Sequence, residues 1–95
     1  MHIMDIPITN YNDVVAMESE ICRLLRCSNS KCAAMHTESF MRLRANLLST
    51  DTNSVPMLGR TVYMPEGLVL TLFYGEACRF VELSWMYAEV THTLL

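Results

Sequence analysis

Charged residues, glycine and proline are all scarce in this 95-residue sequence. Only 18% of the residues are charged, against roughly 25% in a typical globular domain. The three glycines, Gly59, Gly67 and Gly75, are spaced eight residues apart and fall where turns are expected. A phosphate-cradling loop needs closely spaced glycines at the start of a helix, so we expect no nucleotide site of this kind.

The sequence also lacks a positive charge balance, a targeting segment and a long apolar run. A net charge of −3 makes nucleic acid an unlikely partner, because domains that bind it are usually strongly basic. The start of the chain has no basic segment followed by an apolar one, so we expect a cytoplasmic protein with reduced thiols. The most apolar stretch, residues 68–74, is far shorter than the roughly 20 residues of a membrane-spanning helix, so we expect no membrane partner.

Apolar residues are abundant, at 52% of the chain. A chain of 95 residues is too short for two separate cores, so we predict a single domain over residues 1–95. A domain of this size buries only about two thirds of the surface that its unfolded chain exposes. We therefore expect apolar surface to remain exposed unless a second protein chain covers it.

Two amphipathic helices are predicted in the first half of the chain. Apolar residues recur at three- and four-residue steps after Asn12 or Asp13, either of which is a suitable N-cap. This first stripe consists of Val14, Met17, Ile21, Leu24 and Leu25. The polar residues 28–30 interrupt the pattern, and a second helix is expected to follow them and to end near Leu48.

Strands are predicted at the N-terminus and in the second half of the chain. Residues 2–8 alternate loosely up to Pro7, which suits a short edge strand. Residues 60–64 and 68–74 are rich in Val, Tyr, Thr and Leu and are separated by Pro-Glu-Gly. This pattern predicts a β-hairpin in which Gly67 adopts a positive φ, after a linker over residues 49–59.

The last 20 residues, 76–95, fit two interpretations. Val81, Leu83 and Trp85 alternate with polar residues, as they would in a strand. However, the segment contains no Gly, Pro, Asn or Asp and exceeds an ordinary strand in length, which favours a C-terminal helix. We predict the helix and keep C-terminal strands, completing a small antiparallel sheet, as the alternative; the fold class is α+β with either ending.

A metal site is the first candidate for chemistry. Cys22, Cys27, Cys32 and His36 follow a Cys-x4-Cys-x4-Cys-x3-His pattern, which brings four soft ligands together in the sequence. Structural zinc sites usually hold their cysteines in closer pairs, and a buried thiol beside a hydrogen-bonded histidine explains the same residues. We therefore predict no metal and no cofactor, and keep a small zinc- or nucleic-acid-binding module as an alternative function.

A thiol-dependent enzyme is the second alternative. A nucleophilic cysteine needs a histidine held in a fixed position, and two of the three histidines, His2 and His92, lie near the chain ends. Chain ends are poorly suited to fixing a general base. We therefore predict that the protein is not an enzyme.

Several features instead indicate a recognition surface. The chain has eight methionines, whose flexible thioethers adapt to irregular partners, and residues 21–48 carry five bases against one acid. The predicted partner-binding residues are Trp85, Tyr87, Val81, Met35, Met41, Arg42 and Arg44. We predict a non-enzymatic protein–protein interaction module that acts as a homodimer, an adaptor or an inhibitor of a larger macromolecule, by analogy with phage or viral antagonists of host machinery.

Overall fold

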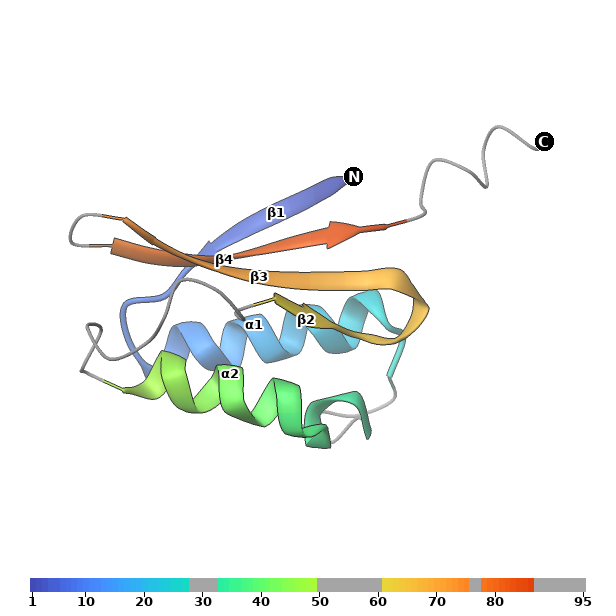
Figure 1. The fold of residues 1–95 in the computed structure, drawn as a ribbon, viewed down its shortest axis with the longest axis horizontal. Coiled ribbons are helices and arrows are strands. Elements are labelled where there is room, and N and C mark those ends of the chain that lie inside the picture. Colours follow the sequence, from blue (N-terminus) through green and yellow to red (C-terminus); the bar gives the residue numbers. More distant parts are fainter. Residues whose placement is uncertain (28–32, 50–60, 76–77, 87–95) are drawn as a thin grey trace.

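The computed structural model describes residues 1–27, 33–49, 61–75 and 78–86. The described elements are β1 (His2–Pro7), α1 (Tyr11–Leu24), the 3-10 helix η1 (Ala33–His36), α2 (Glu38–Leu48), β2 (Thr61–Tyr63), the 3-10 turn η2 (Pro65–Gly67), β3 (Leu68–Gly75) and β4 (Cys78–Trp85). The strands form one antiparallel sheet in the order β1-β4-β3-β2, and both α-helices lie on the same side of it (Figure 1). The predicted α+β class is confirmed.

The core lies between the sheet and the two α-helices. Alternate strand residues point towards the helices, because successive side chains in a strand lie on opposite faces of the sheet. Those buried strand residues are Val62, Leu68, Leu70, Leu72, Val81 and Leu83, and they form one cluster with Val14, Met17, Ile21, Phe40, Leu43 and Leu47 of the helices. Fully burying a side chain of this kind contributes about 1.5–3 kcal/mol, so this cluster is the main source of stability.

The two interior strands of the sheet are β4 and β3. Strand β4, the last described strand, pairs with β1, the first. It pairs along its whole length with β3 and also with β1, so its backbone is hydrogen-bonded on both sides. The amide of Trp85 donates a hydrogen bond of 2.8 Å to the carbonyl oxygen of Met1, which connects the end of β4 to the first residue of the chain. The predicted N-terminal edge strand is therefore confirmed, and β4 is the strand with which it pairs.

Helix α1 begins with a capping box. Asn10 is the N-cap, its side chain accepts a hydrogen bond from the amide of Asp13, and the Asp13 side chain accepts one from the amide of Asn10. The N-cap thus lies two residues before Asn12 and three before Asp13, the two positions predicted for it. The hydroxyl and amide of Thr9, each 2.7 Å from the Asp13 carboxylate, lower the pKa of that carboxyl below its ordinary value. Its stabilising effect is therefore present above the ordinary pKa and is lost as the pH falls through the lower, folded-state value.

Replacing Asn10 by alanine tests this cap. Asn10→Ala removes the side-chain acceptor for the Asp13 amide, so we expect the free energy of unfolding to fall by about 1 kcal/mol. Urea denaturation followed by circular dichroism measures the change. Asn12→Ala is the matched control, because Asn12 is an exposed residue inside the first turn, and an equal loss in that variant would show that the cap is not at Asn10.

The second helix and the hairpin largely follow the prediction. Helix α2 is capped by the Thr37 hydroxyl, which accepts a hydrogen bond from the Phe40 amide, and it ends at Leu48 as expected. In the β2–β3 hairpin Gly67 has φ of 84°, as predicted, and Glu66 also has a positive φ of 64°. The predicted helix start directly after residues 28–30 was wrong, because residues 33–36 form the separate 3-10 helix η1 and α2 begins only at Glu38. Most of the linker predicted at 49–59 lies outside the described residues. Within the described ranges, no helix has the length and apolar character required to span a membrane.

The C-terminal helix is the part of the prediction that was wrong. Residues 78–85 form strand β4, as in the alternative interpretation. The strand is favoured because β1 and β3 offer it backbone partners on both sides, and because its alternation puts Val81 and Leu83 into the core. Residues 87–95, including Tyr87, lie outside the described residues.

Candidate functional site

The face of the sheet turned away from the helices is the candidate site. No described helix covers it (Figure 1). By strand alternation and register this open sheet face includes His2, Asp5 and Pro7 on β1, Cys78, Phe80, Glu82 and Ser84 on β4, Val69, Thr71 and Phe73 on β3, and Thr61 and Tyr63 on β2. These residues stand on four paired strands, so the backbone holds them in fixed relative positions.

Two phenylalanines form an apolar group at one end of the open sheet face. Phe73 and Phe80 are directly opposite in the β3–β4 register, and their rings stack with centroids 5.1 Å apart and planes inclined by 15°. Phe73 remains 39% exposed. Stacking two rings in this way contributes about 0.5–1.5 kcal/mol. The exposed part of the Phe73 ring can still contact a further apolar group.

A second apolar group lies at the other end of the face. Tyr63 on β2 is 70% exposed, and Val69, opposite it on β3, is buried but does not belong to the core cluster beneath the helices. Met86, which follows β4, is 50% exposed. Large apolar side chains are thus present at both ends of a face that no described helix covers.

Between these groups lies a pair of carboxylates. Asp5 and Glu82 are directly opposite in the β1–β4 register, and Nε2 of His2 lies 2.9 Å from a carboxylate oxygen of Asp5. Ligand atoms of His2, Asp5 and Glu82 all lie within 4.8 Å of one another. Like charges directly opposite in an antiparallel pair destabilise it, and no described arginine forms an ion pair with either carboxylate.

The described arginines lie elsewhere. The helix ion pairs are Glu20–Arg23 at 2.7 Å, Glu38–Arg42 at 2.7 Å and Glu18–Arg44 at 3.2 Å. Arg79 points to the helix side, where it donates to the carbonyl oxygens of Asn46 and Ser49 at the end of α2. Among the described residues, the open sheet face therefore carries Asp5 and Glu82 without an arginine, while Arg23, Arg42 and Arg44 pair with acids on the helix side.

The predicted partner-binding residues do not gather on one surface. Val81 and Met35 are buried in the core, and Trp85 is partly buried at the helix side of β4, packed against the core. Met41 is 48% exposed on α2. Tyr87 lies outside the described residues.

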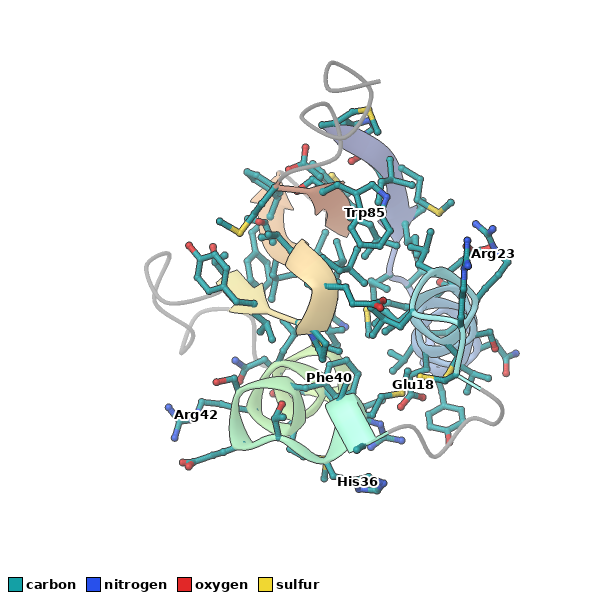
Figure 2. The ribbon with its side chains drawn as sticks, turned by 90° about the vertical axis from the view of Figure 1, so that its right-hand side faces the viewer. Glu18, Arg23, His36, Phe40, Arg42 and Trp85 are labelled. Atoms are coloured by element: carbon teal, nitrogen blue, oxygen red, sulfur yellow. The ribbon has the colours of Figure 1, made fainter. Side chains whose placement is uncertain are left out.

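The two predicted basic residues are both engaged in ion pairs. Arg42 is exposed and binds Glu38 within α2, and Figure 2 shows it pointing away from the body of the protein. Arg44 is partly buried and joins α2 to Glu18 of α1. Of the predicted residues, Met41 and Arg42 therefore remain the accessible ones on the helix side.

The cysteine and histidine set is dispersed in the described part of the chain. Cys22 is buried, and His36 is exposed on η1 and points outward in Figure 2. Cys27 is disulfide-bonded, contrary to the expectation of reduced thiols, and a disulfide sulfur is not a thiolate ligand. Cys32 lies outside the described residues. The one group of metal-binding side chains found among the described residues is that of His2, Asp5 and Glu82.

Sequence reasoning missed the open sheet face. Its signal was present in the alternation of Val69, Thr71 and Phe73 with buried leucines, which marks one face of a strand as separate from the core. Phe80 and Glu82 became visible as part of it only once residues 78–85 were known to be a strand.

Comparison with known proteins adds no further assignment. No protein-family model, curated protein or solved structure matches this chain. The function is therefore argued from the residues of the open sheet face.

Proposed function

We propose that this chain is a non-enzymatic protein–protein interaction module that binds its partner through the open sheet face. The observation that carries the proposal is the stacked pair Phe73 and Phe80 on a sheet face without a described helix over it. Aromatic side chains are the commonest anchors of protein interfaces, and a rigid sheet loses little conformational entropy when it binds. The apolar composition, 52% of the chain, supports the same conclusion.

A protein partner is favoured over single-stranded nucleic acid. Aromatic rings on a four-stranded sheet are also a platform on which nucleic-acid bases stack. Binding of that kind needs bases that neutralise the phosphates, whereas this face carries Asp5 and Glu82. The two carboxylates repel a phosphate backbone, so we favour protein.

The finer proposal concerns how the module acts. A small module with one binding face suits an adaptor or an inhibitor that occupies a larger macromolecule. The zinc-binding and thiol-enzyme alternatives gain no supporting observation among the described residues.

Removing the phenylalanine pair tests the proposal. In Phe73→Ser/Phe80→Ser the core beneath the helices is untouched, so we expect a folded protein whose partner, captured from the native host, is recovered at least about tenfold less. The captured protein is quantified by mass spectrometry, and circular dichroism verifies the fold.

The matched control replaces two exposed apolar residues on the helix side, Tyr11→Ser/Met41→Ser. This control is expected to capture the same partner as the original chain. The proposal fails if the partner is retained by Phe73→Ser/Phe80→Ser and lost by Tyr11→Ser/Met41→Ser.

A further inference from the structure

We infer that the partner presents a lysine or arginine beside apolar side chains, so that the open sheet face takes a basic, heterologous protein segment rather than a second copy of this chain. The inference rests on the proposed function, since it names the chemistry of the partner at the same face. It is carried by the carboxylates Asp5 and Glu82, which lie opposite each other and pair with no described arginine.

Among the described residues, no lysine or arginine offsets the repulsion between the two carboxylates. Nε2 of His2 lies 2.9 Å from Asp5, and ligand atoms of His2 and Glu82 lie within 4.8 Å of each other, but His2 carries a positive charge only when protonated. Glu82 forms no ion pair with any described residue. On the helices, by contrast, Glu18, Glu20 and Glu38 each have an arginine. A partner cation placed between Asp5 and Glu82 would interact with both, and the forked guanidinium of arginine suits paired carboxylate oxygens best.

The spacing on the strand adds a geometric requirement. Phe80 and Glu82 are alternate residues of β4 on the same face, which places them about 6.6–7 Å apart along the strand. A partner must therefore present its base and its apolar group at a similar separation. Alternate residues of an extended segment, or residues one turn apart in a helix, meet this requirement.

Charge argues against a second copy. A symmetric dimer through the open sheet face would use the same patch on both copies, because a two-fold interface is self-complementary. It would bring two Asp5–Glu82 pairs towards each other, and juxtaposed like charges disfavour association. Arg23, Arg42 and Arg44 lie on the helix side of the sheet, where each already pairs with a glutamate of α1 or α2.

A random peptide library displayed on phage tests the inference with a defined probe. The library is selected against the original chain, Phe73→Ser/Phe80→Ser, and Asp5→Asn/Glu82→Gln. Peptides recovered on the original chain are expected to be enriched in both apolar residues and Lys or Arg. Their synthetic versions should bind Asp5→Asn/Glu82→Gln at least about tenfold more weakly, with less dependence on salt.

The control for net charge is Glu20→Gln/Glu38→Gln, which removes two carboxylates from the helices instead. Its affinity for the same peptides is expected to stay close to that of the original chain. Equal weakening in this control, or enrichment of apolar residues without bases, would overturn the inference and leave the proposed function standing. Recovery of the same peptides on the original chain and on Phe73→Ser/Phe80→Ser would overturn the proposed function itself.

Sedimentation equilibrium over a wide concentration series gives an independent readout. We expect the original chain to remain a monomer. A dimer that dissociates in Phe73→Ser/Phe80→Ser would overturn the inference in favour of a second copy while supporting the open sheet face as a binding surface. Tight binding of a single-stranded oligonucleotide that is lost in the same variant would overturn both the inference and the proposed function.

Discussion

Replacing Val81 by aspartate is expected to leave the protein unfolded. Val81 is fully buried on the helix side of β4, a strand paired on both sides. A carboxylate at this position would have no buried cation to pair with among the described residues, and burying an unpaired charge costs several kcal/mol. The whole free energy of unfolding of a small domain is about 5–15 kcal/mol, so this cost removes most or all of it.

Circular dichroism in the far and near ultraviolet measures the outcome. The matched control is Phe80→Asp, which places the same side chain one residue earlier, on the open sheet face. The control is expected to fold, with a modest loss of stability from the broken ring stack. Equal melting temperatures for the two variants would contradict both the strand alternation and the assignment of the two faces.

Replacing Phe40 by alanine is expected to lower the free energy of unfolding by about 3–5 kcal/mol. Among the described residues Phe40 is the largest fully buried side chain, and Figure 2 shows it between α2 and the sheet. Its removal leaves a cavity where α2 packs on the strands. In a domain of this size each kcal/mol corresponds to roughly 4–8 °C, so the melting temperature should fall by at least about 12 °C.

Differential scanning calorimetry measures this shift. Met41→Ala is the control, because Met41 is the next residue along α2 and is half exposed. Surface substitutions of that kind usually change the free energy of unfolding by less than about 0.5 kcal/mol. If Met41→Ala were as destabilising as Phe40→Ala, the assignment of the buried face of α2 would be wrong.

The features that the sequence predicted well are those with strong local causes. The apolar period of α1 and the stop of α2 at Leu48 follow from residues within one or two turns. The hairpin follows from the Pro-Glu-Gly turn and its positive φ at Gly67. The N-cap lies two or three residues before the predicted positions because Asn10, Asn12 and Asp13 all have suitable side chains, and the Thr9–Asp13 hydrogen bond that accompanies the cap at Asn10 is not a periodic signal.

The features that the sequence predicted poorly depend on distant partners. Residues 78–85 have both helical and strand periodicity, and the strand prevails because β1, from the opposite end of the chain, pairs with it. The position of Trp85 against the core and the burial of Val81 follow from that pairing. Asp5 and Glu82 lie opposite each other only because of the register between β1 and β4, so no local sequence pattern predicts that they are neighbours.

The central claim, that the open sheet face is the binding surface, is tested most directly by hydroxyl-radical footprinting of the free protein and of its complex with the captured partner. We predict that Tyr63, Phe73 and Phe80 react in the free protein and are protected in the complex, while Tyr11 and Met41 on the helix side stay equally reactive in both. Protection of Tyr11 and Met41, with Tyr63, Phe73 and Phe80 still reactive in the complex, would contradict the account.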